Sequence, residues 1–207
     1  MGRSREKKKP EERKAQILEA AFKCFMAKGY HSATMDDIAR TARLSKGAVY
    51  WYFKDKQDVF IAYFLFQVES YYSEMKKILL SKKSVEQKIY ELGRYLLKKA
   101  EQEPDTNRVL HELWIQALEH KKTWKVFKEI YRRSIDEVEN LLREGMEKGE
   151  LRPDINPRWV GFMLNSVMGN LDHLEMIGFE DIDPDQYWQE ASRILFEGIL
   201  PERKSKI

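Results

Sequence analysis

The residues between 45 and 56 combine cations, minimal side chains and aromatic hydroxyl groups in one short stretch. The run Lys46-Gly47-Ala48 places a cation beside two small side chains, which lets a backbone come close to a phosphate or a guanine edge. The run Tyr50-Trp51-Tyr52 follows, and successive helical residues point about 100° apart, so these three rings cannot all enter one core. We expect Val49 and Phe53 to face inward and the two tyrosine hydroxyl groups to face DNA. Lys56 lies close to the start of the next expected helix, where it could meet a phosphate.

Two short helices joined by a tight turn are expected to position these residues. Thr34 can cap a helix whose third residue is Asp37, a variant of the capping box. After the brief connection Arg43–Leu44, Ser45 can cap a second short helix. The spacing predicts a helix-turn-helix motif over about residues 34–53, whose second helix would enter the major groove of DNA.

The rest of the chain also favours helices, and no convincing run of alternating strand residues is found. A helix starting near residue 10 precedes the motif and ends at Gly29. We therefore predict an all-α protein with about nine helices. Further helix boundaries are expected at Ser84 with Gln87, at Pro104, at Gly149, at Asn156–Pro157 and at Asp183–Pro184.

Charge is divided unevenly along the chain. Residues 1–56 hold 14 Lys and Arg against 7 Asp and Glu, a net charge of +7, whereas residues 57–207 hold 23 against 27, a net charge of −4. This division favours a polyanion as a partner of the basic N-terminal part alone, and a merely solvated surface is the alternative. The five cations within residues 1–9 could likewise form an arm that reaches the minor groove, or a solvated tail.

The segment TMDDIARTARLSKGAVYWYFKDKQDVF resembles the DNA-binding head of TetR-family transcriptional regulators, and RKAQILEAAFKCFMAKGYHSAT resembles the first helix of that head. The resemblance covers about residues 10–65. It implies a three-helix, homeodomain-like head over residues 10–65, a flexible basic arm over 1–9, and a ligand-binding and dimerisation domain over 66–207. Bodies in this family diverge widely, so the resemblance adds little about the ligand.

The resemblance also implies DNA contacts, residue by residue. The family often has a small residue, frequently glycine, in the turn where this chain has Arg43. Arg43 is therefore expected to accept a less favoured backbone conformation, to add a phosphate contact, or to do both. The positions implied to bind DNA are Thr34, Arg43, Ser45, Lys46, Gly47, Tyr50, Trp51, Tyr52 and Lys56.

Several classes of protein are not expected. The longest stretch without a charged residue, Trp159 to Leu171, has thirteen residues, whereas a membrane-spanning helix needs about 20. The N-terminal residues lack the apolar region of a signal peptide, and the single cysteine, Cys24, allows no internal disulfide, so we expect a cytoplasmic protein. Cys24 itself is expected to be buried. No P-loop, G-x-S-x-G motif or metal-ligand spacing of the four histidines occurs, so we expect no enzyme activity, no cofactor and no metal.

Large aromatic and flexible side chains are frequent in the body. Such a stripe is usually plain core, but the resemblance implies a cavity that binds a hydrophobic or amphipathic small molecule. The candidate ligand-binding residues are Phe66, Tyr90, Tyr95, His111, Trp114, Phe127, Tyr131, Phe162, Asn165 and Met168.

The last two helices are expected to form a homodimer interface, because one recognition helix reads too few base pairs for specificity. Gly161, Asn165 and Gly169 lie four residues apart, where small side chains permit close helix approach. The candidate interface residues are Val160, Leu164, Val167, Leu171, Trp188, Ala191, Ile194 and Leu195.

These observations together favour a transcriptional repressor that a small-molecule effector releases from a palindromic DNA operator. The alternatives are an activator, a helical small-molecule-binding protein whose basic head is incidental, and a small helical enzyme, which the absence of a catalytic constellation disfavours.

Overall fold

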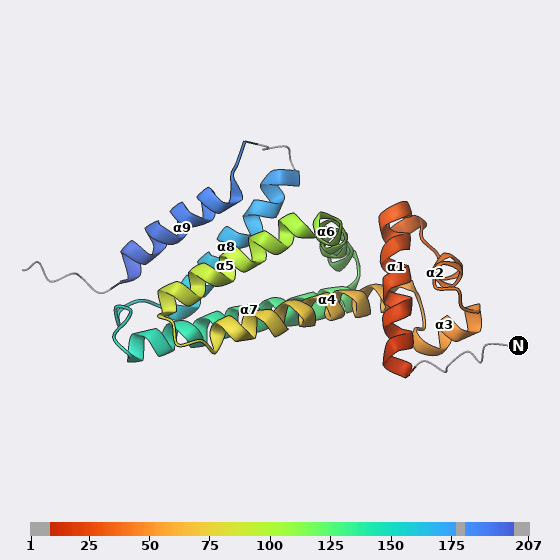
Figure 1. Cartoon of the computed structure of the whole chain (residues 1–207), viewed down its shortest axis with the longest axis horizontal. Coiled ribbons are helices and arrows are strands. Elements are labelled where there is room, and N and C mark those ends of the chain that lie inside the picture. The colour runs from red at the N-terminus through yellow and green to blue at the C-terminus, as the bar shows by residue number, and fades with distance from the viewer. Residues whose placement is uncertain (1–8, 177–180, 201–207) are drawn as a thin grey trace, which may run out of the picture. The chain divides into compact units, whose positions relative to one another are not determined.

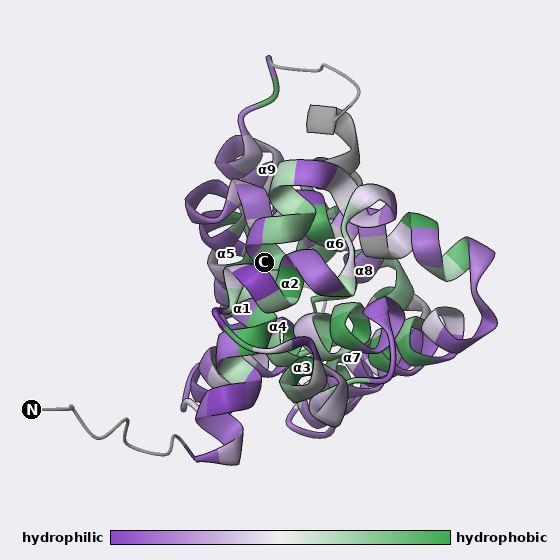
Figure 2. Cartoon of the chain, turned by 90° about the vertical axis from the view of Figure 1, so that its right-hand side faces the viewer, coloured by the Kyte–Doolittle hydropathy of each residue, from purple (hydrophilic) through white to green (hydrophobic). Residues whose placement is uncertain are grey.

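The computed structural model describes residues 9–176 and 181–200, and within these ranges every regular element is an α-helix (Figure 1). The prediction of an all-α fold is therefore confirmed. Hydrophobic and hydrophilic residues are interspersed along the helices (Figure 2), as expected where a helix buries one face and exposes the other. No helix among these residues is long and apolar enough to cross a bilayer. The helices are α1 (Pro10–Ser32), α2 (Met35–Thr41), α3 (Lys46–Tyr52), α4 (Lys56–Leu79), α5 (Val85–Gln102), α6 (Pro104–Glu119), α7 (Lys121–Glu147), α8 (Pro157–Met176) and α9 (Pro184–Ile199).

Contacts within the chain divide the described residues into two compact units. The first unit comprises the residues up to Ser70 together with Arg108–Val126, and the second comprises Tyr71–Asn107 and the residues from Phe127 onward. The first unit thus takes in much of α6, which the sequence analysis assigned to the body. Helices α4, α6 and α7 each contribute to both units.

The first unit has a core built from the three N-terminal helices and the start of α4. Helix α1 packs against α2, and α2 packs against α3. As expected, Val49 and Phe53 point into this core, and Cys24 is buried there with its Sγ atom 3.2 Å from Thr41 Oγ1. The segment from α6 is tied on by polar contacts, such as the hydrogen bond of 2.7 Å that the Arg108 guanidinium donates to the carbonyl oxygen of Met26.

The second unit is built around a close packing of α5 against α9. The indole of Trp188 is 2% exposed, and its Nε1 atom donates a hydrogen bond of 3.0 Å to the carbonyl oxygen of Tyr90. A Cβ atom built on Gly93 would lie only 2.1 Å from Trp188 Cε2. Glycine at position 93 is therefore what allows α5 to lie directly on the indole face.

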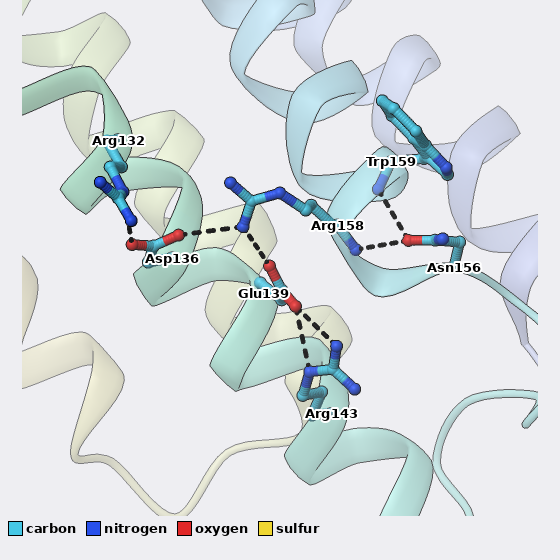
Figure 3. A network of polar contacts seen from close by, with 7 residues as sticks. All are labelled: Arg132, Asp136, Glu139, Arg143, Asn156, Arg158 and Trp159. Carbon is cyan, nitrogen blue, oxygen red and sulfur yellow. Dashed lines mark hydrogen bonds and ion pairs between the residues drawn. The ribbon is translucent and has the colours of Figure 1, made fainter. Parts of the chain in front are cut away.

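Polar contacts fix the first turn of α8 to α7 (Figure 3). The Arg158 guanidinium donates to Asp136 at 3.1 Å and to Glu139 at 2.8 Å. The side-chain oxygen of Asn156 accepts hydrogen bonds from the backbone N–H groups of Arg158 and Trp159, at 3.1 and 3.2 Å, as an N-cap residue does. These bonds hold the start of α8 in one orientation and leave the Trp159 ring exposed.

Candidate nucleic-acid interface

The predicted capping box at the start of α2 is present. The backbone N–H of Asp37 donates to Thr34 Oγ1 at 3.1 Å, and the backbone N–H of Thr34 donates to the Asp37 carboxylate at 3.1 Å. The Lys28 ammonium also donates to this carboxylate at 2.7 Å. Hydrogen bonds from Lys28 and then Thr34 lower the pKa of Asp37 to about 2, so the carboxylate stays charged in all but strongly acidic solution. The first turn of the motif is therefore firmly fixed.

The turn between α2 and α3 contains a strained backbone. Arg43 has a φ angle of +55°, which lies in the left-handed region. The backbone N–H of Leu44 donates to the carbonyl oxygen of Ala39 at 2.9 Å, which closes the end of α2. The expectation that Arg43 accepts a less favoured conformation is confirmed, whereas its phosphate contact stays a prediction.

Replacing Arg43 by glycine should raise the free energy of unfolding by about 0.5–1 kcal/mol, because the left-handed conformation costs a residue with a side chain about 1–2 kcal/mol and part of the gain is lost to the greater freedom of glycine in the unfolded chain. Urea unfolding followed by circular dichroism measures the change.

Arg43→Ala is the matched control, since it removes the same charge and keeps the strain. Equal stability of the glycine and alanine variants would contradict the strain. If Arg43 also contacts a phosphate, both variants should bind DNA more weakly and with a flatter salt dependence.

The second helix of the motif begins as predicted. Ser45 caps α3, because its Oγ atom accepts a hydrogen bond of 3.2 Å from the backbone N–H of Ala48. Gly47 is exposed, and nothing in the chain lies within 4 Å of the position that its Cβ atom would take. Among the residues predicted to bind DNA, the exposed ones are Thr34, Arg43, Ser45, Lys46, Gly47, Tyr50 and Trp51, while Tyr52 and Lys56 are half-buried.

An acidic partner of Lys46 was missed by the sequence analysis. The Lys46 ammonium lies 2.8 Å from the Asp36 carboxylate and 5.9 Å from the ring centre of Tyr50. The hydrogen bond with Asp36 raises the pKa of the Lys46 ammonium. The sequence indicated that Asp37 completes the cap of α2, but it gave no signal that the neighbouring Asp36 contacts α3.

Lys56 serves first to tie α4 to α1. Its ammonium donates to the carbonyl oxygens of Tyr30 and His31, at 2.5 and 2.8 Å, and lies 4.5 Å from the ring centre of Tyr30. Partial burial lowers the pKa of this ammonium. Two of its three N–H donors are thus used inside the protein, and its predicted phosphate contact stays a prediction.

The ten candidate ligand-binding residues are divided between the two units, and no single pocket described here gathers them. Tyr95 lines a groove of about 510 Å³, and its hydroxyl group is buried without a hydrogen-bond partner among the described residues. Asn165 is already satisfied, since it is bonded to Ser134 and to the carbonyl oxygen of Gly161. Phe66, His111 and Trp114 belong to the first unit, and Tyr90, Tyr95, Phe127, Tyr131, Phe162, Asn165 and Met168 belong to the second.

The candidate dimer residues are placed in two different environments. Val160, Leu164 and Trp188 are buried in the core of the same chain, so they are not available to a partner in the way the sequence analysis expected. Ile194 is 58% exposed, whereas Val167, Ala191 and Leu195 are half-buried. The side chain of Leu171 lies outside the described part of the structure, as do residues 1–8 of the expected N-terminal arm.

Trp159 and Met163 add exposed apolar side chains to α8, with 63% and 57% exposure. That small residues on this helix permit close approach of a second copy stays a prediction, since Gly161 faces α7 of the same chain at an ordinary van der Waals distance. A Cβ atom on Gly161 would lie 3.6 Å from the carbonyl oxygen of Ile135.

Comparison with known proteins identifies the N-terminal part of the chain. Residues 17–63 match the family model described as bacterial regulatory proteins, tetR family. These residues therefore form a DNA-binding head of the TetR-family type. The matched residues include α2, the strained turn and α3, so the helix-turn-helix described above is the part that carries the relationship. The family is one of regulators rather than enzymes.

Individual relatives support the assignment over different lengths. The HTH-type transcriptional regulator SrpR of Pseudomonas putida is 47% identical over 49 residues, which are 24% of this chain and 23% of that protein. The fatty acid metabolism regulator protein of Bacillus subtilis (strain 168) is 24% identical over 159 residues, 76% of this chain and 78% of the relative. The matches to the first three curated relatives span only 21% to 25% of those proteins, so similarity to them is confined to the head.

Solved structures share the fold over almost the whole chain. A TetR transcription regulator from Haloarcula marismortui ATCC 43049 superposes with a TM-score of 0.82 at 19% identity, covering 92% of this chain and 100% of that one. FadR from Bacillus subtilis in complex with stearoyl-CoA superposes with a TM-score of 0.77 at 20% identity, covering 89% and 98%. At these identities the likeness concerns the fold alone.

Proposed function

We propose that this chain is a sequence-specific DNA-binding repressor of the TetR family that a small molecule releases from a palindromic operator. The observation that carries the proposal is the exposed face of α3, where Lys46, Gly47 and Tyr50 stand on a helix that the fixed turn of α2 orients. In this proposal the head over residues 10–65 binds DNA, and residues 66–207 bind the effector and a second copy. A regulator of chromosomal DNA acts in the cytoplasm, which we propose as its location.

Selection of bound duplexes from a random DNA pool tests DNA recognition directly. We expect enrichment of a near-palindrome with half-sites about 34–36 Å apart or a multiple of that distance. Lys46→Ala should weaken operator binding and lower the salt slope by roughly one charge. A pool without any enriched sequence would favour the alternative of a ligand-binding protein with an incidental basic head.

An amphipathic acyl compound is the effector class that we propose. A solved FadR that shares this fold holds stearoyl-CoA, and the fatty acid metabolism regulator is similar over three quarters of the chain. The buried, unpaired hydroxyl of Tyr95 offers a polar anchor within the second unit. Stearoyl-CoA should raise the melting temperature and lower the operator affinity, and the operator should lower the affinity for stearoyl-CoA by the same factor. If stearoyl-CoA raises the melting temperature but does not change the operator affinity, its proposed role as a regulator of DNA binding is contradicted.

A dimer through the exposed apolar residues of α8 and α9 completes the proposal. Ile194→Glu should weaken dimerisation at least tenfold, because it places a charge among the exposed apolar residues that we propose for the seam, Trp159, Met163 and Ile194. The loss of the dimer should also weaken operator binding, since a palindromic operator is bound by two heads. Sedimentation velocity at micromolar concentration measures the oligomeric state.

Leu80→Glu is the matched control, because Leu80 is an equally apolar and more exposed residue of the second unit, at 75%. It should leave the dimer intact. Wild-type protein that sediments as a monomer, with and without operator, would refute the interface.

A further inference from the structure

The pair formed by Asp36 and Lys46 has no evident task in folding. Both side chains are more than half exposed, at 56% and 61%, and exposed ion pairs contribute little to stability. The cap of α2 is formed by the neighbouring residues Thr34 and Asp37, not by Asp36. The pair therefore lies on the surface of the helix-turn-helix as a feature that the fold does not require.

The Asp36 carboxylate also weakens the electrostatic attraction of this surface to the phosphates of DNA. Lys46 occupies the first position of α3, where its charge would attract any phosphate. Both oxygens of Asp36 lie close to this ammonium, at 2.8 and 3.2 Å, and offset its charge. Asp36 thus opposes binding to DNA of arbitrary sequence, whereas a base that donates a hydrogen bond to its carboxylate would offset this effect.

The major-groove edge of one base pair offers such a contact. Guanine presents the acceptors O6 and N7, and cytosine presents the donor N4. O6 and N4 are hydrogen-bonded to each other at about 2.9 Å, which matches the 2.8 Å between Lys46 Nζ and Asp36 Oδ1. The Lys46 ammonium is thus a donor for guanine O6, and the Asp36 carboxylate is an acceptor for cytosine N4. The spacing of the two side-chain groups matches the spacing of the two base atoms.

We propose that Asp36 and Lys46 together read one G·C base pair in each operator half-site, with Lys46 donating to guanine and Asp36 accepting from cytosine N4. This inference rests on the proposed DNA-binding function. It makes Asp36 a specificity-determining residue, since it opposes binding wherever the cytosine amino group is missing. The Tyr50 ring, which belongs to α3 as Lys46 does, lies 5.9 Å from the Lys46 ammonium.

Selection from a random DNA pool, with the wild-type protein and with Asp36→Asn and Lys46→Gln, tests the proposal. Both variants should lose the preference for G·C at the same position of the half-site, by roughly tenfold in relative affinity. Asp36→Asn should in addition bind non-operator DNA more tightly, with a salt dependence steeper by roughly one phosphate contact. Asp36→Ser, which also removes the charge, repeats the test should the amide variant be unstable.

Glu74→Gln is the matched control, because Glu74 is an exposed carboxylate of the second unit that pairs with Lys77 at 2.7 Å. It changes the net charge equally and should leave base preference unchanged. Tighter binding of Asp36→Asn to every sequence, with the base preference intact, would overturn the proposal while leaving the DNA-binding function in place. Failure of the wild-type protein to enrich any sequence would overturn both.

Discussion

Replacing Gly93 by alanine is expected to lower the free energy of unfolding by about 3 kcal/mol, at the upper end of the usual cost of overpacking. The added methyl group would lie 2.1 and 2.3 Å from Cε2 and Cζ2 of Trp188, far inside van der Waals contact. The indole cannot easily withdraw, because it is buried and its Nε1 atom is bonded to the Tyr90 carbonyl. Urea unfolding followed by tryptophan fluorescence measures the loss.

Two further variants separate overpacking from other effects of the substitution. Gly198→Ala changes a glycine of α9 whose Cβ position is free of neighbours, so it should be neutral or stabilising by up to about 1 kcal/mol. Trp188→Phe should partly rescue Gly93→Ala, because the smaller ring vacates the space of the new methyl group. Wild-type stability of Gly93→Ala would show that α5 and α9 separate without cost, contrary to the packing described here.

The helix starts could be predicted because they depend on neighbours in sequence. Thr34 and Ser45 cap the helices that their positions indicate, and Ser84 forms the expected box with Gln87. The strain at Arg43 was expected from the resemblance instead, since TetR-family heads often have a small residue, frequently glycine, at this position of the turn.

Contacts between elements could not be predicted in this way. An apolar stripe on α9 indicates a buried face, but it does not show whether the face meets the same chain or a second copy. Trp188 was therefore expected in the dimer interface and is found in the core, against a glycine 95 positions earlier in the sequence. The pairing of Asp36 with Lys46 depends in the same way on the angle between α2 and α3, which the turn sets and which no spacing encodes.

Replacing Gly47 by alanine should have opposite effects on the protein alone and on its complex with DNA. No atom of the chain lies within 4 Å of the new methyl group, and alanine favours a helix over glycine by up to about 1 kcal/mol, so the melting temperature should stay the same or rise. Operator affinity should nevertheless fall at least tenfold, because the methyl group occupies the space through which the backbone of α3 approaches the groove. Fluorescence anisotropy with a labelled operator measures this affinity.

Gly198→Ala again supplies the matched control, since it adds a methyl group to an exposed helical glycine of the second unit, which is not part of the proposed DNA-binding head. It should leave operator affinity unchanged. A stabilised Gly47→Ala protein with wild-type affinity would mean that this part of α3 does not approach DNA closely, even if the chain binds an operator. Because the protein itself has room for the methyl group, any loss of affinity in a folded variant reports on what lies outside the protein, and this makes Gly47 a more direct probe of the docked surface than Lys46, whose removal changes charge and contact together.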